Sequence, residues 1–107
     1  MSRCVVHDNN VYLAGVTARD FSGGVGAQLS DILTTIDNYL EQVGSDKSKI
    51  LTAQVWIADM ALVADMNAVW NAWVDPARPP ARACVSGELV RPDALVEVQV
   101  TAVIESE

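Results

Sequence analysis

Apolar side chains recur at intervals of three and four residues through the segment 25–43, which is the spacing of one face of an α-helix. The stripe consists of Val25, Leu29, Ile32, Leu33, Ile36, Tyr39, Leu40 and Val43. Gly44 follows at once, and glycine commonly ends a helix by adopting a left-handed conformation. The pattern predicts one long amphipathic helix that stops at Gly44.

A second helical stripe is shorter and covers about 62–74. Its predicted buried residues are Leu62, Met66, Val69, Trp70 and Trp73. Pro76 and the pair Pro79-Pro80 follow, and proline neither continues a helix nor favours a helical residue before it. This helix is therefore expected to end before Pro76.

Strand patterns occupy much of the remaining chain. Alternation with a period of two predicts a strand over 95–104, with the following residues on one face: Val96, Val98, Val100, Ala102 and Ile104. A strand is also expected over 50–58, with one side made of Leu51, Ala53, Val55 and Ile57. A short strand is expected over 82–86, and the segments 4–6 and 11–14 predict a hairpin because Asp8-Asn9-Asn10 has turn chemistry.

The expected order of elements is β-β-α-β-α-β-β, an α+β fold with one sheet and two helices on one face of it. Two helices cannot cover both faces of a sheet of this width. The other face is expected to carry Arg82, Cys84 or their neighbours, with one side of the last strand. Large apolar surfaces are rare on monomers, so another subunit is the simplest cover for that face.

Composition narrows the class of protein. A length of 107 residues fits a single domain, 1–107, and 50% hydrophobic residues argue against disorder. Seven basic against fourteen acidic residues give a net charge of -7, which disfavours binding to nucleic acid or to an anionic membrane surface. Neither a membrane span nor the apolar part of a signal peptide is recognisable. Two distant cysteines and one histidine predict no zinc site and favour a cytoplasmic protein with reduced thiols.

Arg82 is the first candidate for chemistry. It follows the rigid pair Pro79-Pro80 and opens a strand of small and apolar residues, so its planar guanidinium is suited to a carboxylate or phosphate. Cys84 lies two residues on and faces the same way in a strand. The structural alternative for Arg82, a salt bridge to Asp93 or Glu97 or a plain surface position, is the commoner case.

Three further polar groups are candidates. Glu97 lies within the apolar strand 95–98 and would suit general acid–base work on a water, although a solvated strand face is the commoner explanation. Cys84 has no evident histidine partner, because His7 belongs to the predicted hairpin, so lining a pocket suits it better than nucleophilic attack. Asn67 interrupts the apolar second helix and faces either solvent or a site.

Three segments together resemble the RidA (YjgF) family of small enamine/imine deaminases. They are Pro80-Ala81-Arg82-Ala83-Cys84-Val85, Leu95-Val96-Glu97-Val98, and Val55-Trp56-Ile57-Ala58-Asp59 followed by Met66-Asn67-Ala68-Val69-Trp70. The resemblance spans 10–104 and is particularly close to the short YoaB-like branch over 50–74. It implies a chorismate-mutase-like fold of the bacterial trimeric type, a homotrimer, and clefts between its subunits.

The resemblance also implies site residues. The position matching Arg82 would bind the carboxylate of a 2-imino or 2-enamino acid, and that matching Glu97 would position the water that attacks the C=N carbon. Cys84 would line the pocket, Gly15 would offer backbone contacts, and Asn67 would lie at the cleft. The products would be a 2-oxo acid and ammonia, with no metal and no cofactor.

Two departures keep a second function open. Deaminases of the family carry a Gly-Pro-Tyr-type segment before the first strand, and this sequence begins after that point; Val16-Thr17 stands where Gln-Ile-Pro is usual. The missing segment favours a non-catalytic trimer that binds a small carboxylate metabolite, whereas the retained Arg82 and Glu97 favour an enzyme. A thiol-based sensor acting through Cys84 is a third, weaker hypothesis. The net charge of -7 gives no support to the ribonuclease label that some members bear.

Overall fold

Five strands form one sheet, in the order β1-β2-β5-β3-β4, in the computed structural model of the chain, which describes residues 1–104. The strands are β1 (Cys4–His7), β2 (Asn10–Leu13), β3 (Ile50–Ile57), β4 (Ala81–Ser86) and β5 (Val96–Val103). Neighbouring strands pair antiparallel except β3 and β4, which pair parallel. Because β3 and β4 are parallel, the chain must cross over between them, and it does so through a helix.

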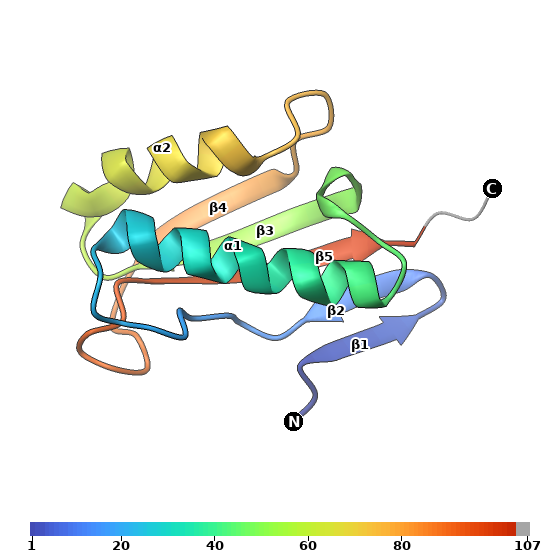
Figure 1. Ribbon diagram of the computed structural model, residues 1–107, viewed down its shortest axis with the longest axis horizontal. Helices are drawn as coiled ribbons and strands as arrows, with labels where there is room; N and C mark the ends of the chain where they lie inside the picture. The colour runs from blue at the N-terminus through green and yellow to red at the C-terminus, as the bar shows by residue number, and fades with distance from the viewer. Residues whose placement is uncertain (105–107) are drawn as a thin grey trace.

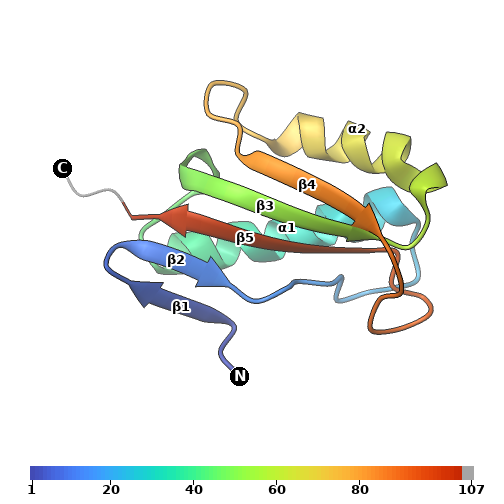
Figure 2. The same cartoon turned by 180° about the vertical axis from the view of Figure 1, so that it is seen from behind.

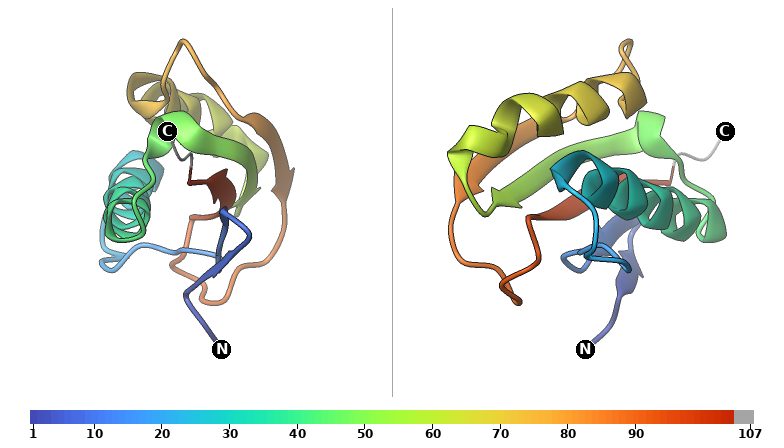
Figure 3. Two further views of the ribbon diagram at one scale, coloured as in Figure 1. Left: turned by 90° about the vertical axis from the view of Figure 1, so that its right-hand side faces the viewer. Right: turned by 60° about the vertical axis from the view of Figure 1, so that its left-hand side comes forward.

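The helices are α1 (Val25–Gln42) and α2 (Val63–Trp73), and single 3-10 turns precede β3 (Lys47–Lys49) and α2 (Met60–Leu62). The predicted order of strands and helices is therefore confirmed. Both helices lie on one side of the sheet, which the end-on view makes plain (Figure 3, left). In Figure 1 α1 crosses in front of the sheet and α2 runs along β4, whereas from behind the strands stand uncovered (Figures 1 and 2). We call the two sides the helix face and the open face.

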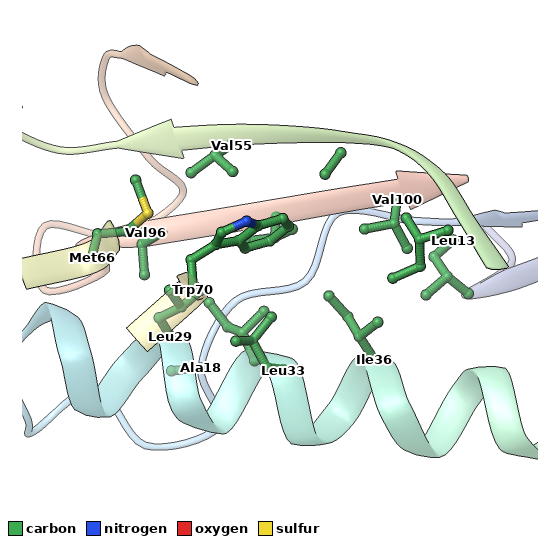
Figure 4. Packing of buried hydrophobic residues seen from close by; sticks show 14 of the residues in the cluster. Leu13, Ala18, Leu29, Leu33, Ile36, Val55, Met66, Trp70, Val96 and Val100 are labelled. Atoms are coloured by element: carbon green, nitrogen blue, oxygen red, sulfur yellow. The ribbon is translucent and has the colours of Figure 1, made fainter. Parts of the chain in front are cut away.

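The core of the helix face confirms the predicted stripe of α1. Leu29, Ile32, Ile36 and Leu40 are completely buried, and Tyr39 and Val43 flank them half-buried. They pack on the alternating apolar residues of β5, as the close view shows for Leu29, Leu33 and Ile36 beside Val96 and Val100 (Figure 4). The predicted ends hold too, since Gly44 has φ of 80° and Asp8 and Asn9 form the hairpin turn with φ of 49° and 65°.

One predicted strand face is wrong. Leu51 was expected to share a face with Ala53, but its side chain is 49% exposed, and Ile50 takes the buried place at 4%. The pairing of β3 with β5 shifts between Ile50 and Thr52, which is a β-bulge. An extra residue at a bulge reverses the alternation on one side of it, so the period-two pattern holds only from Thr52 onward.

The stripe of α2 is narrower than predicted. Met66 and Trp70 are buried, whereas Val69 and Trp73 are half-buried at its flank. Leu62 belongs to the preceding 3-10 turn rather than to α2. α2 lies over the edge of the sheet, so only part of its apolar side packs on the sheet, and the buried stripe is correspondingly narrow.

A buried glutamine ties two loops to the core. Gln28 on α1 is fully buried, and its amide nitrogen donates to the carbonyl oxygens of Phe21, Gly23 and Asp93 at 3.0–3.2 Å. Its Oε1 accepts from the backbone N–H of Leu95 at 2.9 Å. Gln28 thus joins the loop before α1 to the segment that leads into β5 two residues before Glu97.

Within residues 1–104, neither helix combines the length and the apolar composition that crossing a membrane would require.

Candidate functional site

Arg82 lies on β4 at the edge of the sheet and points toward the helix face. It stands opposite Ala53, which is buried on that face, and reaches three side chains of α2. Nη2 donates to Asn67 Oδ1 at 2.8 Å, and Nη1 lies 3.8 Å from the Sδ of Met66. The guanidinium carbon lies 5.2 Å from the ring centre of Trp70. The guanidinium therefore makes its side-chain contacts with α2, at the edge of the sheet.

Cys84 stands on the same side of β4 as Arg82, as the spacing predicted. Its partner in the ladder is Val55, and it is half-buried against the core. Cys4 and Cys84 are both free thiols, so no disulfide joins them. Cys84 is thus placed beside Arg82 without contacting the lone histidine, His7, which lies at the exposed end of β1.

Glu97 lies on β5 and points to the open face. Val96 and Val98 beside it are completely buried on the helix face, so alternation sends Glu97 the other way. Its ladder partner on β3 is Trp56, which is half-buried. The carboxylate rests against Gly15: a Cβ built on Gly15 would overlap Oε2 and lie 3.1 Å from Cδ. Glycine at this position leaves the room that the carboxylate occupies.

The sheet therefore separates the two main candidates. Arg82 belongs to the helix face at the β4 edge, and Glu97 belongs to the open face of the central strand β5. The salt bridges that sequence offered as alternatives for Arg82 are not formed, since Asp93 instead pairs with Arg91 at 2.8 Å and Arg82 bonds Asn67. Within one copy of the chain, the side chains of Arg82 and Glu97 therefore point to opposite faces of the sheet.

The open face is neither a core nor an ordinary solvated surface. A hollow of about 420 Å³ lies on it, bordered by three consecutive residues of each of β3 (52–54), β4 (81–83, which include Arg82) and β5 (99–101). Thr52 and Thr101 bond each other across the strands with 2.5 Å between their hydroxyl oxygens. Toward the rim stand large apolar side chains, with Tyr12 45% and Val85 46% exposed. The exposed apolar side chains, rather than the polar hollow between them, are the part of this face that favours contact with another folded surface.

A second hollow, of about 280 Å³, lies on the other side of the segment that contains Gly15. Arg3, Arg19, Thr35 and Tyr39 are among the residues that line it. Arg19 is occupied by Asp31, with 2.6 Å between Nη2 and Oδ1. This hydrogen bond, with two backbone N–H bonds from Arg19 and Asp20, lowers the pKa of Asp31 against the cost of its desolvation. Among the residues described, no group of three His, Cys, Asp or Glu side chains is arranged to hold a metal ion.

Sequence reasoning missed two contacts of Arg82, those with Met66 and Trp70. Both residues were assigned to the buried stripe of the second helix, which is correct, but the stripe also meets Arg82 at the sheet edge. Their spacing of four residues, with Asn67 next to Met66, was the available signal, since i and i+4 share one side of a helix. That side could be matched to Arg82 only once the crossover from β3 to β4 was placed.

A protein family described as "Endoribonuclease L-PSP" matches residues 1–104 of the chain. The RutC family protein YoaB of Escherichia coli is 36% identical over 103 residues, covering 96% of this chain and 90% of that protein. The chain belongs to the RidA (YjgF) family. The resemblance drawn from its sequence motifs is thereby confirmed.

Two further members of the RidA family bear on fold and activity. The crystal structure of NMB1025 from Neisseria meningitidis, titled a member of the YjgF protein family, superimposes with a TM-score of 0.96 at 38% identity, covering all of this chain and 89% of that one. The predicted α+β fold is therefore that of the family. A protein of Acinetobacter baylyi named 3-aminoacrylate deaminase RutC is 32% identical over 97 residues, covering 85% of this chain and 76% of that protein.

Proposed function

We propose that this protein is an enamine/imine deaminase that hydrolyses reactive 2-imino or 2-enamino acids in clefts between copies of the chain. Its similarity to a relative named 3-aminoacrylate deaminase supports the reaction type. The observation that carries the proposal is the separation of Arg82 and Glu97 onto opposite faces of one sheet. A cleft that uses both must draw Arg82 from one copy and Glu97 from the next, with the open face buried between them.

Arg82 binds the substrate carboxylate in this mechanism. A guanidinium presents parallel N–H groups that match a carboxylate, and such paired bonds fix orientation as well as charge. Asn67 accepts from Nη2 and Met66 lies near Nη1, and each terminal nitrogen carries a second N–H that these two contacts do not use. Cys84, on the same side of β4, lines the pocket, and Asn67 takes its place at the cleft through Arg82.

Glu97 activates the water. Its carboxylate accepts a proton as the water oxygen bonds to the electrophilic C=N carbon, giving a carbinolamine. Glu97 returns that proton to the amino group and then takes the hydroxyl proton as the C=O bond forms and the C–N bond breaks, so that ammonia and a 2-oxo acid leave. An enamine reaches the same point after protonation at carbon. Gly15 supplies the space in which the carboxylate sits and the backbone against which the substrate rests. Every atom comes from substrate and water, so these steps require no cofactor.

A complementation experiment tests the proposal. An amino-acid oxidase generates 2-imino acids from a panel of amino acids, semicarbazide competes for them, and the diverted 2-oxo acid is measured. Arg82→Ala and Glu97→Gln are each expected to lose activity. When the two variants are coexpressed, about a quarter of the wild-type activity should return, because a randomly mixed assembly holds one intact Arg82–Glu97 pair in four. A mixture that stays inactive while both variants assemble would place the site within one copy and overturn the proposal.

The competing function is a binding protein for a small carboxylate metabolite, formed by the same proposed homotrimer in the cytoplasm. It differs from the enzyme in one outcome. If wild-type protein binds a carboxylate through Arg82 but diverts no imine from semicarbazide, the cleft is a binding site without chemistry. The family description as an endoribonuclease finds little physical support here, because a chain with a net charge of -7 repels a phosphate backbone.

A further inference from the structure

We propose that Met66 and Trp70 are positioning residues, which hold the Arg82 guanidinium in the orientation that receives a substrate carboxylate. The inference rests on the proposed function, because it concerns the same arginine. It goes beyond that function in assigning a role to two side chains that otherwise belong only to the core. The mechanism is restriction of a mobile cation before the substrate arrives.

The contacts with Arg82 come from a single turn and a half of α2. Met66, Asn67 and Trp70 lie at relative positions 0, 1 and 4, which brings all three to the side of the helix that overhangs the β4 edge. The sulfur of Met66 and the amide oxygen of Asn67 take one terminal nitrogen each, and the indole lies alongside the guanidinium carbon at 5.2 Å. Arg82 is thus restrained at two nitrogens and beside an aromatic ring.

Two of the three restraining side chains are buried in the core. Met66 is completely buried and Trp70 is 5% exposed, whereas Arg82 belongs to the exposed residues. Figure 4 shows Met66 and Trp70 directed from α2 into the layer between the sheet and α1, among Leu29, Val55 and Val96. A flexible surface arginine loses rotamer freedom when it binds an anion. Anchoring its guanidinium on core residues removes part of that cost before binding.

Trp73 offers a matched contrast on the same helix. Its ring lies 5.4 Å from that of Trp70, so both tryptophans belong to one aromatic pair. Trp73, however, donates its indole N–H to Asp37 at 3.1 Å and lies beneath the ammonium of Lys47. Removing Trp73 therefore perturbs α2 and its packing on α1 without removing a contact of Arg82.

The first test measures carboxylate binding and turnover in the full-length protein. Pyruvate, a small 2-oxo acid of the kind that the reaction releases, serves as the probe for Kd, and the imine assay supplies KM and kcat. Trp70→Leu should raise Kd and KM about 3- to 10-fold with kcat within about twofold. The reason is that the Trp70 ring supports the Arg82 guanidinium, which binds the carboxylate equally in the ground state and the transition state. Met66→Leu, which keeps the volume, should raise them about twofold, and Trp70→Phe should restore most of the loss.

The controls separate this inference from the proposed function. Trp73→Leu should lower the Tm as Trp70→Leu does, yet leave Kd and KM unchanged. If Arg82→Ala abolishes pyruvate binding while Trp70→Leu and Trp73→Leu behave alike, the positioning role is wrong and the proposed function stands. If Arg82→Ala binds pyruvate as well as wild type does, both are wrong.

A spectroscopic readout decides the positioning role without substrate. The Arg82 Nε–H resonance of wild-type protein should be displaced by the indole ring current and should exchange slowly with water. Trp70→Leu should abolish the displacement, Trp70→Phe should keep part of it, and Trp73→Leu should leave it. The phenylalanine variant covers the case in which Trp70→Leu does not fold. An Arg82 Nε–H chemical shift that is the same in wild type, Trp70→Leu and Trp70→Phe would overturn the proposal.

Discussion

The helix face and the open face of the sheet are built by the same strands and differ in what completes them. On the helix face, α1 and α2 fill the space, and β5 contributes only buried apolar side chains. On the open face, the same strand contributes Glu97, Gln99 and Thr101, and neither helix covers them. The helix face is covered by helices of the same chain, so the hydrophobic core forms there. Neither helix covers the open face, which is the face that the proposed function places against another copy.

The placement of the two charged candidates follows from this division. Arg82 stands at the edge of the helix face, where the core residues Met66 and Trp70 contact its guanidinium. Glu97 stands on the open face, where Gly15 leaves room for its carboxylate. Substitutions can therefore break assembly, fold or catalysis separately, depending on the face they touch.

The largest effect is expected from a charge placed in the middle of the open face. Gln99→Arg puts a long cation beside the hollow that Thr52 and Thr101 border. If copies pack there, the buried charge has no partner, so the assembly should fall to the mass of one chain and deamination should drop at least about 100-fold. Light scattering and circular dichroism check mass and fold. Gln42→Arg, on the exposed end of α1, is the control; an assembled, active Gln99→Arg protein would mean that this face stays uncovered.

The next effect belongs to the helix face. Gln28→Ala leaves three carbonyl oxygens and the N–H of Leu95 without their buried partner, so unfolding free energy should fall by about 3 kcal/mol. Urea unfolding measures the change. Gln42→Ala, an exposed glutamine of the same helix, should alter stability by less than about 0.5 kcal/mol. Equal losses in the two variants would contradict the role assigned to the amide of Gln28.

Sequence predicted the helix face well because its signals are local and periodic. The stripe of α1, the alternation of β5 and the Asx turn each lie within a few residues of one another. The prediction that Leu51 faces the core was wrong because Ile50 and Leu51 are both apolar. Only the pairing of β3 with β5 shows which of the two the bulge turns away from the core. Apolar patterning within a strand does not encode such a shift.

The candidate site was predictable as residues but not as an arrangement. The spacing of Arg82 and Cys84 placed them on one side of β4, yet that strand reads Ala-Arg-Ala-Cys-Val-Ser and has no apolar side to tell which face it is. Its parallel partnership with β3 decides this, and with it the separation from Glu97. The contacts of Arg82 with α2 likewise join residues that are far apart in the chain, since Asn67 and Arg82 are separated by 15 positions. Long-range contacts of this kind leave no periodic trace in the sequence.

A smaller effect should come from filling the space beside Glu97. Gly15→Ala places a methyl group where Oε2 lies, and the flexible carboxylate can swing away at little cost to stability. The Tm should fall by a few degrees at most, while kcat should fall about tenfold because the general base is displaced and carboxylate binding is kept. Gly87→Ala meets no atom within 4 Å and should change neither. A fall in kcat that Gly87→Ala shares would argue against the contact between Gly15 and Glu97.

The smallest effect concerns the acidic groups on the rim of the molecule. Hydrogen bonds from Arg19, Ser48 and Ser22 lower the pKa values of Asp31, Asp46 and Asp20 respectively in the folded chain. Their stabilisation is therefore present above the ordinary value of 3.8 and is lost as the pH falls through the lower folded values. Asp31→Asn should reduce unfolding free energy at pH 7 by less than about 1 kcal/mol, because Arg19 is largely exposed, and should flatten the loss of stability below pH 4. Urea titrations from pH 7 to pH 2.5 measure this, with Glu41→Gln on the same helix as the control. An acid limb as steep in Asp31→Asn as in wild type would mean that the Arg19–Asp31 pair contributes nothing to acid stability.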